Sequence, residues 1–451
     1  NMRINFKDAR SVIDRHMLAD GMSPVIDLER SHGSWLVDGV TGKEYLDLFS
    51  MYASMSVGYN HPYVLDNIDR LTTAAINKPA NSDIYSPQMA EFVDTVGRVA
   101  QPSYLPYAFF IEGGGLAVEN ALKAAFDWKA KKNIIQGKTQ PKNLVIHLKD
   151  CFHGRTGYTM SLTDSPDPRK VQYFPKFNWP RVLNPSIEFP LDETSLEKVI
   201  ELEQKSLAQI KQVLLDNPDD VACMILEPIQ GEGGDNHFRP EYFKEIKQLS
   251  LENDFLLIYD EVQTGIGITG KMWAHQHFCE TNCNLECISH CKSMEPDIIS
   301  FGKKTQCCGI FAGKRLDEID DHVFKESSRI NSTFGGNLVD MVRFTIYLEI
   351  IENENLVDLV SENGSYLISS LASLQNEESN VVSNVRGKGL FCAFDLPSSE
   401  IRNNLIAKVE EEGAIILGCG HRSIRFRPHL NISKNEIDRA MVMIKSAMSK
   451  I

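Results

Sequence analysis

In Phe255-Leu-Leu-Ile-Tyr-Asp-Glu-Val-Gln263, five apolar or aromatic residues are followed directly by two carboxylates, a valine and an amide. An unbroken apolar run of this length, bounded by polar residues, is typical of a strand that is buried on both faces. Buried strands that alternate with amphipathic stretches of ten or more residues predict an α/β fold with a mostly parallel central sheet. Four further runs of the same character predict its other strands: residues 108–111, 144–146, 221–226 and 298–301.

The two ends of the chain differ from this middle part. Residues 34–49 alternate between apolar and polar side chains around a glycine-containing turn, which predicts a β-hairpin. After about residue 340, long helical patterns precede short apolar runs, which is typical of a smaller α+β domain. We therefore predict a large domain over 76–340, and a small domain built from an N-terminal segment, 1–75, and a C-terminal part, 341–451.

The composition excludes several classes of protein. The chain has 451 residues and a formal net charge of −14, so it offers no general attraction to nucleic-acid phosphates or anionic lipid headgroups. No stretch approaches the ~20 consecutive apolar residues of a membrane span. We expect a cytosolic protein with neither a nucleic acid nor a membrane as its partner.

Charged or glycine residues follow each of the five predicted strands. In an open parallel sheet the carboxyl ends of the strands line one crevice, where ligands bind. A single acidic residue after a strand is most often a helix cap, but five such strand ends together predict one binding cleft. The segments concerned are 112–115, 150–155, 227–234, 260–263 and 302–304.

One of these strand ends is the glycine run 113–115, which precedes a helical pattern. Glycines let the backbone approach a ligand closely, and a helix N-terminus presents free N–H groups to an anion. Phosphate binding and a simple tight turn both remain open on this evidence. The run matches neither G-x-G-x-x-G nor G-x-x-x-x-G-K-[ST], which argues against dinucleotides and nucleoside triphosphates.

Asp260 and Lys303 each stand at the end of an apolar strand. A carboxylate that pairs with a pyridinium nitrogen and an amine that forms a Schiff base are the two groups that pyridoxal phosphate needs from a protein. At ~4 Å and an effective dielectric of 20, the carboxylate stabilises the pyridinium by about 4 kcal/mol before its desolvation is counted. The alternative, that Lys303 is a solvated surface lysine, is disfavoured by the apolar strand directly before it.

These motifs resemble those of the class III, or ω-amino-acid, aminotransferases of the pyridoxal-phosphate fold type I group, over nearly the whole chain. Asp260-Glu-Val-Gln-Thr-Gly265 is similar to a family strand end. The resemblance implies that Asp260 contacts the pyridine nitrogen, that Val262 packs on one ring face and that Gln263 meets the phenolic oxygen. Residues 297–303 resemble the family strand that carries the Schiff-base lysine, which gives that role to Lys303 rather than to Lys304.

Two other segments extend the implied cofactor site. Residues 112–123 resemble the phosphate loop and its helix, which implies backbone donors at Gly114 and Gly115. The family usually has a hydroxyl residue at position 115, so the glycine removes one expected phosphate contact. Residues 152–155 resemble an [FY]-H-G-R motif, in which Phe152 would stack on the second face of the ring.

The segment 331–337 resembles a part of the family that completes the site of a neighbouring subunit. The resemblance implies that Ser332 and Thr333 reach the phosphate bound by the other chain. A homodimer with shared active sites is the expected assembly.

Within the family, residues 227–240, 331–337 and 423–428 are most similar to the L-lysine 6-aminotransferases. This implies transfer of the ε-amino group of L-lysine to 2-oxoglutarate, which gives 2-aminoadipate 6-semialdehyde and L-glutamate. The last of these segments also reads much like that of 4-aminobutyrate transaminases. The sequence therefore leaves lysine, ornithine and 4-aminobutyrate open as amino donors.

One site must accept two different substrates in this reaction. The resemblance implies that Glu232 pairs with Arg425 while the ω-amine reacts, and that it leaves when the α-carboxylate of 2-oxoglutarate needs the arginine. Arg155 would bind the distal carboxylate in both half-reactions, since a guanidinium suits bidentate contact. Lys303 would serve as general base and acid. The alternative for Arg425 is a core arginine in a structural ion pair.

Residues 279–291 form an insert that the family normally lacks, with Cys279, Cys283, Cys287 and Cys291 at regular spacing. Four thiolates could hold a structural zinc ion or an iron–sulfur cluster, provided that the chain bends, because a straight helix would separate the outer two by ~18 Å. Free thiols or a disulfide are the alternatives. A metal-binding protein without activity on the same fold is the second functional hypothesis. A nucleotide-binding dehydrogenase is a third functional hypothesis, but it gives no role to Lys303 and Asp260.

Overall fold

The computed structural model describes residues 3–279 and 291–451. The strands of the large central sheet in this part of the chain lie in the order β3-β9-β8-β7-β6-β4-β5. β9 runs antiparallel to both neighbours, β3 and β8, and the other pairs are parallel, so the predicted mostly parallel α/β fold is confirmed. β9 was not predicted, because Cys308 and Gly309 at its start, with Cys307 just before it, hide its apolar pattern. The bounds are β3 Tyr107–Ile111, β4 Leu144–Leu148, β5 Arg181–Val182, β6 Val221–Leu226, β7 Leu256–Asp260, β8 Ile298–Phe301 and β9 Cys308–Ala312.

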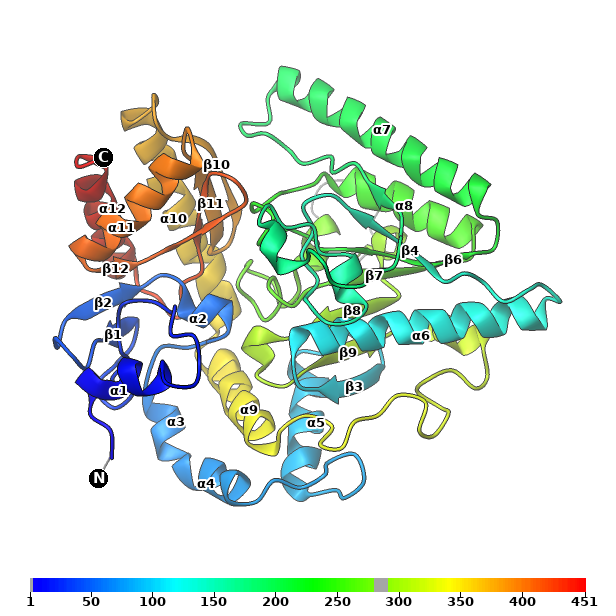
Figure 1. The fold of residues 1–451 in the computed structure, drawn as a ribbon, viewed down its shortest axis with the longest axis horizontal. Coiled ribbons are helices and arrows are strands. Elements are labelled where there is room, and N and C mark those ends of the chain that lie inside the picture. Colours follow the sequence, from blue (N-terminus) through cyan, green and yellow to red (C-terminus); the bar gives the residue numbers. More distant parts are fainter. Residues whose placement is uncertain (1–2, 280–290) are drawn as a thin grey trace.

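Helices cover both faces of this sheet (Figure 1). Alternate residues of β6 divide between two clusters: Cys223 and Ile225 pack with Trp128 of α6, whereas Met224 and Leu226 pack with residues of α8. Since neither face meets water, every position in β6 is apolar, and each fully buried Ile or Leu stabilises the fold by roughly 1.5–3 kcal/mol. α6 lies on one face, and α7 and α8 lie on the other; their bounds are α6 Gly114–Ile135, α7 Glu193–Asp216 and α8 Pro240–Glu252.

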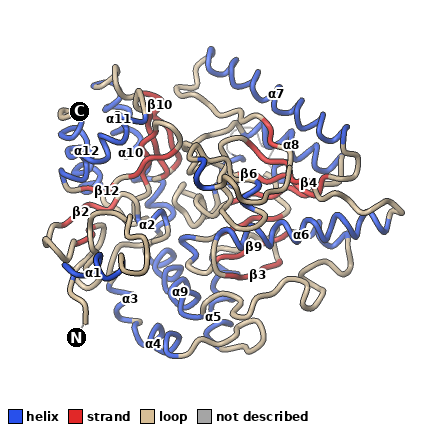
Figure 2. Tube along the Cα trace, in the orientation of Figure 1, coloured by secondary structure: helices blue, strands red, loops and turns tan. Residues whose placement is uncertain are grey.

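The N-terminal hairpin joins the C-terminal part of the chain. β1 pairs antiparallel with β2, which pairs parallel with β12, and a second sheet has the order β10-β11-β14-β13. Figure 2 shows these strands beside the C-terminal helices. The division of the chain at residues 75/76 and 340/341 stays a prediction. The bounds are β1 Trp35–Val37, β2 Glu44–Asp47, β10 Ser383–Lys388, β11 Phe391–Asp395, β12 Ala414–Ile415, β13 Leu417–Cys419, β14 Ser423–Phe426, α10 Leu356–Glu377, α11 Ser399–Glu412 and α12 Lys434–Met448.

The remaining helices connect these parts, and among them α5 packs against α9. None of the helices in the described ranges is both long and apolar enough to cross a membrane. The cytosolic location stays a prediction. The bounds are α1 Phe6–Ile13, α2 Ser50–Ala53, α3 Pro62–Asp66, α4 Ile68–Ile76, α5 Pro87–Val99 and α9 Leu338–Asn353.

The short helix α2 is left-handed. Four consecutive residues without a glycine, Ser50 to Ala53, have φ between 43° and 65°. This conformation costs roughly 1–2 kcal/mol per residue, so tertiary packing must hold it. α2 packs against the turn that begins at Lys303, and Gln306 Nε2 donates a hydrogen bond to the carbonyl of Ser54 at 2.7 Å. The strained turn therefore supports the segment that carries Lys303.

Candidate active site

A hollow of about 280 Å³ lies at the carboxyl ends of the central strands. β3, β4, β6, β7 and β8 all run in the same direction, so the residues that follow them meet at one edge of the sheet. Each of these five strand ends contributes to the lining. The lining residues are Gly114, Gly115, Phe152, His153, Gly154, Glu227, Ile229, Glu232, Asp260, Val262, Gln263, Thr264 and Lys303.

Asp260 ends β7 and is 5% exposed. Its Oδ2 lies 2.8 Å from Nδ1 of His153, and its Oδ1 accepts a hydrogen bond from the backbone N–H of Val262 at 3.0 Å. Nε2 of His153 is buried and has no hydrogen-bond partner among the described residues. A carboxylate can accept about four hydrogen bonds, so Asp260 can still accept one from a ligand in the hollow.

Lys303 follows β8 and lines the same hollow. Burial lowers the pKa of its amine, and the positive charge of Arg425 lowers it further. A lysine with a lowered pKa is more often neutral, and the neutral amine is the nucleophile that attacks an aldehyde. Lys304 is fully buried outside the lining, and its Nζ donates to the carbonyl of Gln263 at 3.3 Å. The geometry therefore favours Lys303 over Lys304 as the reactive amine.

The glycine run at the start of α6 lets neighbouring groups approach its backbone closely. A Cβ on Gly114 would lie 3.1 Å from Cγ1 of Val262, and a Cβ on Gly115 would lie 2.9 Å from Cγ2 of Thr156. The first N–H groups of α6 have no partner within the helix. Together with the positive end of the helix dipole, they can bind an anion such as a phosphate group.

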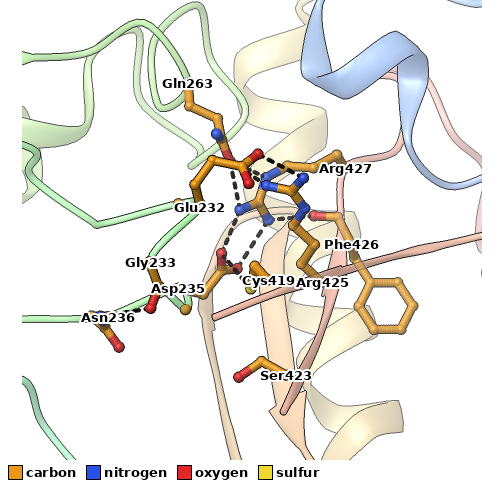
Figure 3. Close-up of polar contacts among 12 residues, drawn as sticks. Glu232, Gly233, Asp235, Asn236, Gln263, Cys419, Ser423, Arg425, Phe426 and Arg427 are labelled. Carbon is orange, nitrogen blue, oxygen red and sulfur yellow. Dashed lines mark hydrogen bonds and ion pairs between the residues drawn. The ribbon is translucent and has the colours of Figure 1, made fainter. Parts of the chain in front are cut away.

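Glu232 and Arg425 form an ion pair at the edge of the hollow, with 2.9 Å between Oε1 and Nη2 (Figure 3). The arginine side chain is 4% exposed, whereas the glutamate side chain is 31% exposed. Burial disfavours the charge of Glu232, but the attraction of Arg425 outweighs it and lowers the pKa of this carboxyl. Arg425 is thus fixed and buried, while its partner stands at the border with solvent.

Sequence reasoning did not single out Glu227, which is buried in the wall of the hollow. Its two oxygens accept hydrogen bonds from the backbone N–H groups of Phe152 at 3.0 Å and Gly231 at 3.1 Å. Burial raises the pKa of this carboxyl well above its usual range, and the nearby charge of Asp260 adds to the shift. Glu227 ties two lining loops together; a carboxylate directly after a fully apolar strand was the only sequence signal for it.

Apart from Arg425, which is not in the lining but pairs with the lining residue Glu232, three predicted site residues do not line the hollow of their own chain. Arg155 is exposed, one residue beyond the lining residue Gly154. Ser332 accepts a hydrogen bond from the N–H of Gly335 at 3.1 Å, and the carbonyl of Thr333 accepts one from the hydroxyl of Ser82 at 3.1 Å. The structure therefore brings together the residues predicted from the strand ends, but not these three.

The predicted metal ligands fall partly outside the described residues. Cys283 and Cys287 belong to the segment 280–290, about which the structure says nothing, while Cys279 and Cys291 are half-exposed at its borders. Within residues 3–279 and 291–451, no group of three or more histidine, cysteine or acidic side chains is placed to hold a metal ion. The zinc or iron–sulfur prediction therefore has no support in the described part of the chain.

The class III aminotransferase family matches residues 17–448, so the chain belongs to this family and the predicted family is confirmed. It is 47% identical to the L-lysine-epsilon aminotransferase of Mycobacterium tuberculosis, over 97% of this chain and 94% of that protein. A solved structure of lysine aminotransferase from M. tuberculosis superimposes with a TM-score of 0.94 and 46% identity, covering 99% of this chain and all of that one. The 4-aminobutyrate aminotransferase of Dictyostelium discoideum is more distant, at 31% identity over 92% of this chain and 84% of that protein.

Aminotransferases of class III use pyridoxal phosphate, and the hollow has the groups that this cofactor requires. The glycine start of α6 suits its phosphate, because the free N–H groups of the first turn can face an anion there and no side chain of Gly114 or Gly115 covers them. The buried carboxylate of Asp260 suits a protonated ring nitrogen, and the amine of Lys303, whose pKa is lowered by burial, suits an aldehyde. The described residues therefore fit the cofactor of the family.

Proposed function

We propose that this aminotransferase moves the ε-amino group of L-lysine to 2-oxoglutarate, giving 2-aminoadipate 6-semialdehyde and L-glutamate. The observation that carries the proposal is the Glu232–Arg425 ion pair at the edge of the hollow. A reaction that takes a terminal amine from one substrate and an α-keto acid from the other needs an arginine that is covered in one half-reaction and open in the other. The high identity to lysine aminotransferases supports lysine as the donor.

The residues of the hollow divide the work of holding pyridoxal phosphate. When bound, the cofactor would supply an aldehyde that takes up the amino group and an electron-withdrawing ring that makes the proton transfers possible. Lys303 would hold its aldehyde carbon, and the same amine, once released, would move protons as general base and acid. The other proposed contacts are Gly114 and Gly115 to the phosphate, Asp260 to the ring nitrogen, Val262 and Phe152 to the two ring faces, and Gln263 to the phenolic oxygen.

The two substrates would use Arg425 differently. While lysine reacts, Glu232 neutralises Arg425, so that no uncompensated positive charge repels the incoming amine. When 2-oxoglutarate binds, its α-carboxylate would replace Glu232 on the arginine, and the partly exposed glutamate can turn toward solvent. Arg155, at the rim, would bind the distal carboxylate of either substrate.

We also propose that two copies of the chain complete each other's sites. Ser332 and Thr333 do not line their own hollow, and Thr333 is exposed. Their side chains would supply phosphate contacts across a dimer interface and so replace the hydroxyl that Gly115 lacks.

The proposal is tested with a panel of amino donors in the presence of pyridoxal phosphate and 2-oxoglutarate. We expect L-lysine to have the highest kcat/KM for glutamate formation and to yield an aldehyde that cyclises, detected by mass spectrometry. L-Ornithine and 4-aminobutyrate are the competing donors, and a higher kcat/KM for either would overturn lysine as the substrate. Lys303→Ala should abolish turnover, and appreciable residual activity would move the reactive amine to Lys304.

The cysteine insert stays a prediction. Metal analysis of the purified protein decides it, since stoichiometric zinc or iron would support a structural site at Cys279, Cys283, Cys287 and Cys291. Absence of both metals would leave free thiols or a disulfide.

A further inference from the structure

Two arginines stand at alternate positions at the end of β14, and each meets a carboxylate from the loop after β6. Arg425 pairs with Glu232, and Arg427 pairs with Asp235 (Figure 3). The first pair was predicted from the sequence, but the second was not. The two pairs differ in how tightly they are held.

The Arg427–Asp235 pair is buried and doubly bonded. Nη1 and Nη2 of the arginine donate to Oδ2 and Oδ1 of the aspartate at 3.0 and 2.5 Å, in a bidentate arrangement. The two side chains are 1% and 0% exposed, and the guanidinium lies 3.4 Å from the ring centre of Phe391. A planar guanidinium held on one side by a carboxylate and on a face by a ring has little freedom to turn.

This fixed guanidinium also contacts Gln263, which lines the hollow. Nε and Nη2 of Arg427 donate to the amide oxygen of Gln263 at 3.0 and 2.9 Å, and Nη1 of Arg425 donates to the same oxygen at 3.4 Å. A guanidinium has donors only, so the atom of the amide that faces the two arginines must be its oxygen. The amide nitrogen is then the group that Gln263 can present to a ligand in the hollow.

The space around this amide is also restricted. A Cβ on Gly231 would stand 2.3 Å from the amide oxygen of Gln263 and 2.7 Å from its nitrogen. Position 231 must therefore be a glycine, because any side chain there would occupy the space of the Gln263 amide. The available space therefore fixes the position of the Gln263 amide, and the arginine donors fix its orientation.

We propose that Arg427, held in place by Asp235, is a positioning residue that orients the Gln263 amide so that its N–H donor faces the cofactor pocket. The ligand group would be an anionic oxygen, which on the proposed cofactor is the phenolic oxygen of the ring. An N–H donor stabilises such an oxygen, whereas a flipped amide would place a carbonyl against it. This inference rests on the proposed cofactor site, but not on the identity of the amino donor.

The decisive variant is Arg427→Lys, which keeps the positive charge beside Asp235 and removes the fork that binds the Gln263 oxygen. Cofactor-free protein is titrated with pyridoxal phosphate, and the visible absorbance of the bound cofactor is followed from pH 6 to 10. We expect about tenfold weaker binding, the size of one charge-assisted hydrogen bond, and a shifted spectral pKa. The same change in a Gln263→Ala background should alter binding less than twofold.

Equal effects of Arg427→Lys in both backgrounds would overturn the proposal, because the arginine would then act on the fold and not through Gln263. Arg239→Lys is the matched control: Arg239 also makes a bidentate contact to a buried carboxylate, that of Glu203, but lies outside the lining. It should change thermal stability without changing cofactor binding or the spectrum.

A second variant tests the amide orientation even if Arg427→Lys does not fold. Gln263→Glu would place an acceptor where the N–H donor is proposed, so it should bind pyridoxal phosphate more weakly than Gln263→Ala does. Equal or tighter binding by Gln263→Glu would overturn the proposed orientation. None of these measurements uses an amino donor, so they stand apart from the lysine assay. Failure of the unaltered protein to bind the cofactor would contradict the proposed function instead.

Discussion

Replacing Glu232 by glutamine keeps the shape of the side chain that covers Arg425 and removes its charge. The ion pair has 2.9 Å between its atoms, and only the glutamate is partly exposed. Two unit charges ~4 Å apart at an effective dielectric of 20 interact by about 4 kcal/mol, while fully exposed pairs contribute at most about 1 kcal/mol. For a pair between these limits we expect the charge removal to cost about 2 kcal/mol of interaction energy, which corresponds to roughly 30-fold in an equilibrium or rate constant.

This loss should affect the two half-reactions in opposite ways. With Glu232→Gln, an uncompensated Arg425 repels the terminal ammonium of the donor, so kcat/KM for lysine should fall roughly 30-fold. The acceptor no longer has to displace a carboxylate from the arginine, so KM for 2-oxoglutarate should stay the same or fall. Stopped-flow absorbance of the cofactor measures each half-reaction separately in single-turnover experiments.

The control is Glu203→Gln, which removes the partner of another arginine, Arg239, outside the lining. It should leave both half-reactions unchanged even where it lowers the melting temperature. If Glu232→Gln slows both half-reactions by the same factor, the ion pair has a structural role and the reasoning about exchange at Arg425 is refuted.

Three further predictions follow from the same site. Lys303→Met should stabilise the cofactor-free protein at neutral pH, because burial lowers the pKa of this amine below its usual 10.5. The buried lysine destabilises the folded state most at a pH below its folded pKa. The gain in melting temperature from Lys303→Met should therefore shrink as the pH rises toward 10.5. Gly115→Ser should weaken binding of pyridoxal phosphate, because its Cβ would lie 2.9 Å from a methyl of Thr156, and adding Thr156→Ser, which removes that methyl, should restore binding in the same titration. Thr333→Ala subunits mixed with Lys303→Ala subunits should regain activity after dissociation and reassociation, because the intact lysine of one chain would then meet the intact threonine of the other; mixtures that stay inactive would contradict shared sites.

The sequence predicted the strands that form the floor of the site. The runs 221–226 and 255–259 are apolar at every position because α6 and α8 cover the two faces, and a pattern this uniform has few alternatives. β9 escaped prediction because cysteine and glycine at its start hide its apolar pattern, and because one of its two partners, β3, lies far away in the chain. The left-handed turn at Ser50–Ala53 was also beyond prediction, since no glycine marks it and contacts with distant segments, such as the hydrogen bond from the Ser50 hydroxyl to the carbonyl of Arg427, help to hold it.

In the site, too, features set by local sequence could be predicted, whereas contacts between distant segments could not. Lys303 and Asp260 could be found because each follows its own apolar strand, so local sequence places both at one edge of the sheet. The contact between Arg427 and Gln263 joins residues 164 positions apart, and no sequence pattern near either residue indicates it. For Arg155 the pattern predicts a substrate contact, and this stays a prediction, because the side chain is exposed just outside the lining of its own chain.

The two ion pairs on β14 explain how one buried arginine can serve two substrates under the proposed function. An unpaired buried guanidinium costs several kcal/mol, so each arginine needs an anion at every stage. Asp235 is fully buried and supplies a permanent anion to Arg427, which leaves Glu232 free to serve Arg425 alone. If the α-carboxylate of 2-oxoglutarate takes the place of Glu232, one anion replaces another and Arg425 is never left unpaired. The exchange requires the mobile carboxylate to be the exposed one and the permanent carboxylate to be the buried one, which is the arrangement that the loop from Glu232 to Asp235 provides.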